Sequence, residues 1–295
     1  MDTVPAKKII TPAKGGAWFG IDYNMNLYRG CCHSCIYCDS RSNCYGIEDF
    51  DKVRMKENAI AIVRRELSHK VKKGVVATGA MSDPYNPFEN ELKLTRRALE
   101  LLDEYEYGAA IATKSDLILR DKDILGFISE HSPVICKITV TTVDDSLSKK
   151  LEPGAPPSSR RLEAVAQLSN AGIFTGILMM PVLPFLEDTP ENIVGIVRAA
   201  KESGARFIYP ALGVTLRQNQ REWYFNRLEE LFPSQRLRER YQHQYGNRYQ
   251  CAVPGAKQLW SLFCQECDRA GILYKMQDII AASRMGYENP QLSLF

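Results

Sequence analysis

The sequence alternates between apolar segments of strand length and amphipathic segments of helix length, and this rhythm limits the fold more than any other feature. The apolar segments lie at residues 74–80, 108–114, 134–142, 173–181 and 207–212. Segments with helical spacing lie around them, at residues 55–70, 91–105, 121–129, 158–170 and 190–203. Strands that are apolar almost throughout are typical of a parallel sheet covered by helices. The pattern predicts an α/β fold, and it leaves open a doubly wound sheet or a full or partial barrel.

The two ends of the chain have a different character. A first strand is expected near Leu27 and Tyr28, after a lead that contains glycine, proline and lysine. Residues 217–249 are rich in arginine, glutamine and aromatic residues and are expected to be helical. A last long helix at 256–270 is followed by a strand-like segment at 272–276 and a final helical piece.

Composition narrows the class of protein. With 45% hydrophobic and 25% charged residues, the chain is neither disordered nor fibrous, and its net charge of +3 favours no particular partner. No segment has the length and apolarity of a signal peptide or a membrane span, so we expect a cytoplasmic protein. The nine cysteines are then expected to be reduced, because the cytosol does not maintain disulfides.

Four of the nine cysteines lie within eight residues, directly after the first expected strand. Cys31, Cys35 and Cys38 follow a C-x3-C-x2-C spacing. Three thiolates at this spacing can bind three irons of a [4Fe–4S] cluster and leave the fourth iron free for a small chelating molecule. Zinc remains an alternative, since Cys32 or His33 could complete a set of four ligands, and buried free thiols are the third interpretation.

The cysteine motif on a chain of βα units resembles the radical S-adenosylmethionine (SAM) superfamily over residues 22–213. The resemblance implies a partial (β/α)6 barrel in which SAM chelates the open iron. It also implies reductive cleavage of SAM to a 5′-deoxyadenosyl radical that abstracts hydrogen from a substrate. An electron donor of the flavodoxin or ferredoxin type is implied as well.

Several segments resemble spore photoproduct lyase and its photolyase-like relatives more closely. They are YRGCCHSCIYC, GAMSDPYNPFE, ATKSDLILRD and TTVDDSLSKKLEPGAP. By this resemblance, Lys114 holds the SAM carboxylate, Ser82 is a SAM contact, and Thr139 or Thr141 meets the SAM ribose. The resemblance thus implies an enzyme that acts on DNA, in repair or base modification.

Departures from that group argue for a DNA lesion other than the spore thymine dimer. Beside Ser82, where the resemblance implies a cysteine that returns hydrogen to the product, this chain has Met81. A tyrosine expected after the last cluster cysteine is Asp39 here, although Tyr37 is kept and is the candidate catalytic residue. A radical SAM enzyme for a peptide, RNA or small metabolite remains an alternative. So does a binding or redox-sensing protein that associates with the DNA sliding clamp and whose iron–sulfur cluster is structural.

Two weaker signals lie in the C-terminal part. Cys251, Cys264 and Cys267 could hold a second metal, although the helical spacing around the last two favours core packing. Arginines interleaved with aromatic residues in 217–249 could grip single-stranded nucleic acid. A solvated amphipathic helix face has the same composition, so both interpretations stay open.

The last five residues read QLSLF and follow Pro290. They resemble the motif by which bacterial polymerases and repair proteins dock on the DNA sliding clamp, which would make the clamp a partner through Gln291, Leu292, Leu294 and Phe295. Folding back of this tail onto the barrel is the alternative. The expected organisation is a lead (1–21), a radical SAM core (22–215), a helical extension (216–289) and a clamp-binding tail (290–295).

Overall fold

A seven-stranded sheet, in the order β10-β9-β8-β7-β6-β3-β2, forms the centre of the computed structural model, which describes residues 1–13, 18–70 and 72–287. Neighbouring strands from β3 to β10 are parallel, and β2 pairs antiparallel with β3 at the edge. The strands are β2 (Ile10–Pro12), β3 (Tyr23–Met25), β6 (Val75–Thr78), β7 (Gly108–Thr113), β8 (Val134–Thr139), β9 (Thr175–Met179) and β10 (Phe207–Pro210). Six parallel strands in sequence order confirm the predicted partial (β/α)6 barrel.

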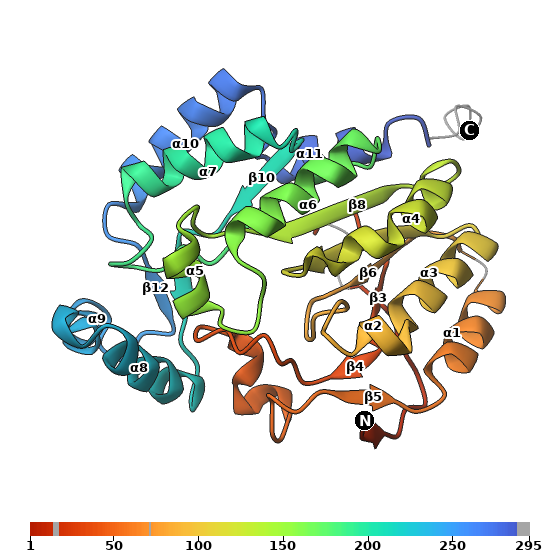
Figure 1. The fold of residues 1–295 in the computed structure, drawn as a ribbon, viewed down its shortest axis with the longest axis horizontal. Helices are drawn as coiled ribbons and strands as arrows, with labels where there is room; N and C mark the ends of the chain where they lie inside the picture. The colour runs from red at the N-terminus through yellow and green to blue at the C-terminus, as the bar shows by residue number, and fades with distance from the viewer. Residues whose placement is uncertain (14–17, 71, 288–295) are drawn as a thin grey trace.

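Helices connect successive strands and cover one face of the sheet (Figure 1). The connecting helices are α1 (Ala59–Ser68), α2 (Glu89–Leu92), α3 (Leu94–Glu104), α4 (Lys122–Ser129), α5 (Asp145–Leu151), α6 (Ser158–Asn170) and α7 (Pro190–Glu202). Short 3-10 turns lie at η1 (Asp39–Arg41), η2 (Asn43–Tyr45) and η3 (Asp116–Asp121). Thr189 caps α7 by accepting from the Asn192 amide at 3.2 Å, and Pro190 is the first helical residue, as predicted.

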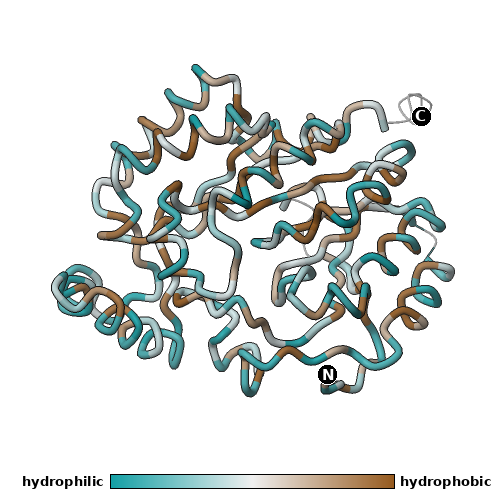
Figure 2. The backbone as a smooth tube through the Cα atoms, in the orientation of Figure 1, coloured by the Kyte–Doolittle hydropathy of each residue, from teal (hydrophilic) through white to brown (hydrophobic). Residues whose placement is uncertain are grey.

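The two faces of the sheet have separate cores. On the outer face, residues such as Val76, Ile111, Ile138, Ile177 and Ile208 pack against the connecting helices. The residues that alternate with them form an inner core with Phe19 and Ile279, and its strand members are Val75, Ala77, Ala110, Ile135, Leu178 and Phe207. Because both faces are buried, strands β6 to β10 are mainly apolar, as Figure 2 shows by their hydrophobic colour.

The inner face is closed by segments from both ends of the chain. Phe19 and Ile21 precede β3, and Ile279 belongs to α11 (Met276–Arg284), the last helix described. The Phe19 amide donates to Met276 Sδ at 3.1 Å, and the Arg284 guanidinium donates to the Gly20 carbonyl at 2.5 Å. Residues 19–21 and α11 therefore pack together against the inner face of the sheet.

The C-terminal part is mainly helical, as predicted. Strand β11 (Gly213–Thr215) pairs antiparallel with β12 (Gln250–Ala252), and between them lie α8 (Gln220–Leu231), η4 (Pro233–Gln235) and α9 (Leu237–Tyr245). Helices α8 and α9 project to one side of the molecule in Figure 1. Helix α10 (Ala256–Ala270) packs along α7. No helix in the described ranges is long and apolar enough to cross a membrane.

The structure moves several predicted boundaries. The helix expected at 55–70 starts at Ala59, because β5 (Arg54–Lys56) joins β1 (Thr3–Val4) and β4 (Tyr28–Arg29) in a small second sheet. The helix expected at 91–105 is divided at Lys93, whose φ of 50° interrupts it. The strand-like segment 272–276 makes a single bridge between Leu273 and Phe207.

Candidate active site

The three motif cysteines lie on a loop that crosses the carboxyl ends of the strands. Gly30 starts the loop with a φ of 82°, and a Cβ at this position would come within 2.5 Å of the Lys52 carbonyl oxygen. No other residue fits there without displacing backbone. The Cys31 amide then donates to the Phe50 carbonyl at 2.8 Å, and the Ile36 amide donates to the Leu151 carbonyl at 2.9 Å. The loop is therefore fixed on both sides of the motif.

The loop brings the three thiols into apolar surroundings. Cys35 is buried, whereas Cys31 and Cys38 are partly exposed. Burial raises the pKa of Cys31 to about 12 and the pKa of Cys35 well above its usual range. Burial also raises the pKa of Cys38, and each of these thiols is near enough to another to influence its charge. Ligation by a metal would deprotonate such thiols.

Backbone amides face two of the sulfurs. Those of His33 and Asp83 favour the thiolate of Cys31, and those of Ser40 and Arg41 favour the thiolate of Cys38. Hydrogen bonds of this kind stabilise and tune cluster sulfurs. Within the described ranges, no group of three or more histidine, cysteine, aspartate or glutamate side chains is arranged around a single metal ion. Three thiols on one loop fit a cluster in which each thiolate binds a different iron.

Cys32 and His33 are engaged elsewhere. Cys32 packs against the outer core of the sheet. His33 is buried, and its Nδ1 lies 3.3 Å from Asp83 Oδ2. These contacts do not favour either residue as a fourth metal ligand.

Asp83 joins the cysteine loop to the ends of two strands. Besides facing His33, its carboxylate accepts from Thr113 Oγ1 at 2.6 Å and from the amides of Lys114 and Tyr85 at 2.9 Å each. Burial opposes the charge, but His33 and these donors lower the pKa of Asp83 to about 2. A buried carboxylate with this many donors fixes the loop relative to β6 and β7.

A second buried network lies beneath Cys35 and is centred on Glu152. Its carboxylate accepts from Tyr37 Oη and forms an ion pair with Arg161 at 2.5 Å. Lys114 Nζ lies 3.9 Å from Glu152 Oε1 and 5.7 Å from the centre of the Tyr37 ring. Burial disfavours the charged form of Glu152, yet Arg161 and Lys114 hold its pKa below its usual range. Burial also raises the pKa of Tyr37, so its hydroxyl stays protonated and donates.

Lys114 connects this network with the cysteines. Its side chain is 18% exposed. Burial lowers its pKa, but the Cys35 thiol and Glu152 raise it more, so the net shift is upward and the ammonium is charged. A charged lysine beside the three-thiol loop can bind an anionic group of a ligand there.

The four predicted SAM contacts lie at the same end of the sheet. Ser82 is on the loop after β6, Lys114 directly follows β7, and Thr139 ends β8. Thr141 lies two residues further on, with its carbonyl accepting from Asn192 Nδ2 at 2.9 Å. The carboxyl ends of barrel strands are where ligands bind. All four residues therefore lie at the carboxyl-terminal edge of the sheet.

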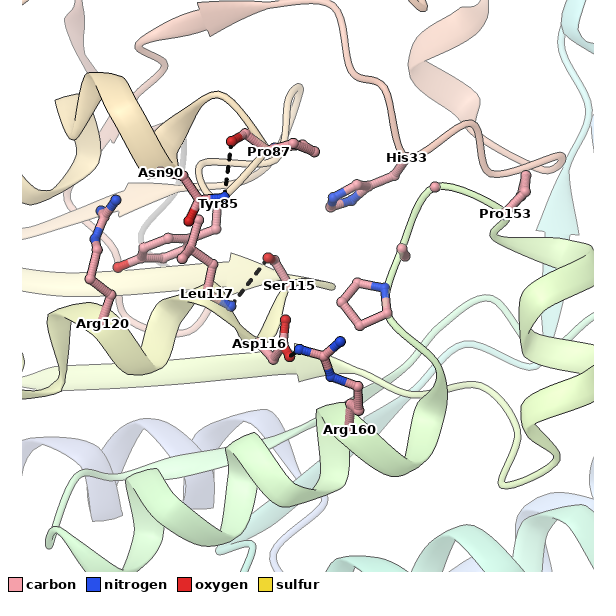
Figure 3. A pocket seen from close by; sticks show the side chains of 13 residues that line it. His33, Tyr85, Pro87, Asn90, Ser115, Asp116, Leu117, Arg120, Pro153 and Arg160 are labelled. Atoms are coloured by element: carbon pink, nitrogen blue, oxygen red, sulfur yellow. Dashed lines mark hydrogen bonds and ion pairs between the residues drawn. The ribbon is translucent and has the colours of Figure 1, made fainter.

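A cavity of about 530 Å³ opens beside the cysteine loop, on the outer side of the strand ends (Figure 3). His33 and Gly154 line it on one side, and Ser115, Arg120 and Arg160 line it on the other. A Cβ at Gly154 would lie 2.3 Å from the Cys32 carbonyl oxygen, so this glycine allows the close approach of the loop. Arg160 pairs with Asp116, and Arg120 pairs with Glu89 and Asp121, which neutralises the cavity's cations.

The arginines and aromatic residues of 217–249 mostly serve the helical extension itself. Tyr224 and Tyr241 are buried and share a hydrogen bond of 2.8 Å. Three arginines pair with glutamates on the surface: Arg227 with Glu230, Arg236 with Glu239, and Arg238 with Glu222 and Glu229. This arrangement favours a solvated helix face over a surface that binds single-stranded nucleic acid.

One part of that segment lines a hollow, where Arg217 is paired with Asp39 at 3.0 Å. Tyr249 is 41% exposed, and the Arg217 guanidinium lies 4.7 Å from its ring centre. Both line a hollow of about 800 Å³ that also includes Arg221 and Asn247 and reaches Cys44, just after the cysteine loop.

Two other predicted features stand apart from this site. Cys251 packs with the core of α8 and α9, whereas Cys264 and Cys267 pack with the outer core of the sheet. The structure thus favours core packing over a second metal site. The predicted clamp-binding residues, Gln291 to Phe295, lie outside the residues described.

Asp83, Glu152 and Arg161 were missed by the sequence reasoning. All three carry charge at positions where the structure is fully buried or nearly so. Asp83 and Glu152 lie within the quoted segments GAMSDPYNPFE and TTVDDSLSKKLEPGAP. The available signal was the position of Asp83 on the loop after β6 and of Glu152 directly after α5.

The site can now be compared with known proteins. The family model described as "Radical SAM superfamily" matches residues 25–198, more than half of the chain. The chain belongs to the radical SAM superfamily. Among curated relatives, an uncharacterized protein of Methanocaldococcus jannaschii is 33% identical over 195 residues, covering 65% of this chain and 71% of that protein. One from Mycobacterium tuberculosis is 28% identical over 249 residues, covering 82% and 72%.

Solved structures of radical SAM proteins share the fold. A spore photoproduct lyase variant with bound AdoMet and dinucleoside spore photoproduct has a TM-score of 0.66 at 15% identity, covering 92% of this chain and 81% of that one. The methyltransferase TsrM from Kitasatospora setae, with cobalamin and a [4Fe–4S] cluster bound, has a TM-score of 0.57 at 12% identity, covering 88% and 60%. These neighbours of the chain are thus solved with AdoMet and with a [4Fe–4S] cluster bound.

Proposed function

We propose that Cys31, Cys35 and Cys38 hold the [4Fe–4S] cluster and that Lys114 binds the carboxylate of SAM. The observation that carries this proposal is the position of Lys114, whose ammonium lies between the cysteine loop and the buried Glu152. When bound, the reduced cluster and SAM supply a 5′-deoxyadenosyl radical that abstracts hydrogen from the substrate.

The chain's own residues orient these groups. Glu152 keeps Lys114 charged and limits where its ammonium lies, and Arg161 and Tyr37 in turn hold Glu152. Tyr37 is thus proposed as a positioning residue. Ser82, Thr139 and Thr141 offer hydroxyl groups at the ends of β6 and β8 and are proposed as further SAM contacts.

We propose that the substrate is DNA carrying a lesion other than the spore thymine dimer. Three features support DNA: the fold shared with spore photoproduct lyase, the hollow lined by Arg217, Arg221 and Tyr249, and the clamp-binding motif of the tail. Met81 in place of the expected hydrogen-donating cysteine supports a different lesion. A sliding clamp and a small redox protein are the proposed partners, in the cytoplasm.

A second candidate function is a radical SAM reaction on a peptide, RNA or small metabolite. The observation that favours it is the pairing of Arg227, Arg236 and Arg238 with surface glutamates, which removes much of the positive charge expected of a nucleic-acid surface.

Formation of 5′-deoxyadenosine tests the proposal. The reconstituted protein is reduced with dithionite in the presence of SAM and either single-stranded DNA, duplex DNA or RNA, at two salt concentrations. We expect 5′-deoxyadenosine in each case, and binding to DNA that weakens as salt rises. A cluster-loaded protein that cleaves no SAM would contradict the enzyme assignment. Cleavage without preferential binding to DNA would favour the second candidate.

A further inference from the structure

Lys137 is a buried cation inside the barrel. It lies in the middle of β8 and is 3% exposed. Its neighbours Cys136 and Ile138 belong to the outer core, whereas Ile135 belongs to the inner core. Because successive side chains of a strand alternate between faces, Lys137 points to the inner face. Its Nζ lies 4.8 Å from the centre of the Phe19 ring, which also belongs to that face.

The surroundings of Lys137 supply no counter-charge. Burial lowers its pKa to about 8, and in the described part of the chain the only opposing influence is the adjacent Cys136 thiol. Its partners across the sheet are Ala112 on β7 and Gly176 on β9, neither of which has a polar side chain. An ammonium kept in such a place is costly unless a ligand supplies an acceptor.

The depth of Lys137 relates it to the proposed SAM site. Thr139 is two residues further along β8 and faces the same side, so Lys137 lies one layer below it, about 7 Å deeper. The side chains near Lys137 at this depth are flat or small. Phe207 pairs with Gly176, and a Cβ on Gly176 would come within 2.5 Å of that ring. Phe19 lies 5.4 Å from Tyr209, measured between ring centres.

We propose that Lys137 binds a carbonyl oxygen on the ring of the substrate from which the radical abstracts hydrogen. A flat ring suits aromatic and small neighbours, and an oxygen acceptor suits an ammonium that has no hydrogen-bond acceptor among the described residues. This inference rests on the proposed function and narrows it to a base that carries carbonyl oxygens. Thymine has such oxygens, whereas adenine has none.

Two dinucleotides that share one backbone test the inference. TpT and ApA are titrated by calorimetry into the holoenzyme with SAM and an oxidised cluster, so that no turnover occurs. The variants are Lys137→Met and, as the matched control, Lys201→Met on the exposed side of α7. We expect Lys137→Met to weaken TpT binding by about tenfold to a hundredfold, the effect of one hydrogen bond to a charged group, and to leave ApA binding unchanged. Lys201→Met should change neither.

The remaining outcomes separate the two proposals. Unchanged TpT binding in Lys137→Met would overturn the role of Lys137, and equal losses for TpT and ApA would assign Lys137 to the phosphate instead. If the wild-type protein bound neither dinucleotide, the DNA proposal would fail together with this one. Lys137→Met should fold, because it removes a buried charge with which no described residue pairs, and its thermal unfolding midpoint is expected to be equal to or above that of the wild type.

Discussion

Lys114 Nζ lies 3.9 Å from Glu152 Oε1, although Lys114 follows β7 and Glu152 follows α5. Glu152 also forms an ion pair with Arg161 on α6, so one carboxylate contacts two cations that have different roles. Arg161 is fully buried and donates to the carbonyls of Pro156 and Thr139, which makes it structural. Lys114 retains an exposed portion and is the cation that a ligand can reach.

Replacing Lys114 by alanine should weaken SAM binding by one to two orders of magnitude, because a charge-assisted contact contributes about 1.5–3 kcal/mol. Iron content should stay at the wild-type level. Equilibrium binding of SAM to the reconstituted protein measures the effect, with Lys149→Ala on the exposed side of α5 as the control. An unchanged SAM affinity would show that Lys114 does not bind it.

Replacing Glu152 by glutamine should destabilise the fold, since it leaves Arg161 as a buried cation without its counter-charge. The loss is expected to be about 3 kcal/mol in the free energy of unfolding. Urea denaturation of the protein without cofactors measures it. Glu202→Gln, at the exposed end of α7, is the control and should have little effect. Equal stability of the two variants would mean that the Glu152–Arg161 pair contributes nothing net.

Replacing Cys35 by alanine should abolish the visible absorbance of the cluster and the cleavage of SAM. Cys32→Ala, three residues earlier in the same loop, should leave iron binding largely intact because Cys32 packs against the outer core. Iron and sulfide analysis with absorbance spectroscopy distinguishes the two variants. Equal damage from both would show that the ligand assignment is wrong.

Asp83 should make stability depend on pH in the acid range. Its pKa in the folded protein is about 2, below the ordinary value of 3.8, so its contribution is complete above pH 4 and is lost as the pH falls to 2. The difference corresponds to about 2 kcal/mol. Urea denaturation of wild type and Asp83→Asn between pH 7 and pH 2.5 should show a stability gap that narrows with acid. A gap that is constant over this range would contradict the assigned role.

Deleting Gln291 to Phe295 should remove binding to a bacterial sliding clamp, because the leucines and the phenylalanine would supply most of the affinity of so short a segment. Cleavage of SAM should be unaffected. Titration of a purified clamp with the full-length and shortened proteins measures the effect. Equal affinity of the two proteins would remove the tail as an argument for DNA.

The sequence predicted β6 to β10 well because these strands are mainly apolar on both faces. The first strand was misplaced, since the barrel begins with β3 (Tyr23–Met25), and the segment expected at Leu27 and Tyr28 forms β4 of the small sheet. The prediction failed where tertiary contacts override local preference. Residues 54–56 form a strand because β1 and β4 are available to pair with it, and neither β1 nor this pairing was expected. Lys93 breaks a helix in a segment of good helix formers, while the nearby Glu89 carboxylate accepts from the Thr95 amide at 2.9 Å.

The site was predictable as a set of motifs but not as a network. The spacing of the cysteines and the position of Lys114 after a strand were visible in the sequence. The partners of these residues were not, because they come from distant segments: His33 meets Asp83, and Tyr37 meets Glu152. The arginines of 217–249 show the reverse case, since a pattern typical of nucleic-acid binding is mostly satisfied by neighbouring glutamates.

The contacts of α11 with Phe19 and Gly20 have a consequence for the order of events during translation. The six parallel strands are complete at Pro210, but the helix that covers their inner face begins only at Met276. A nascent chain on the ribosome would therefore present an uncovered barrel until its last helix emerges. Throughout that interval the cysteine loop and the strand ends have already been synthesised. Insertion of iron and sulfide could thus precede the final closure of the molecule.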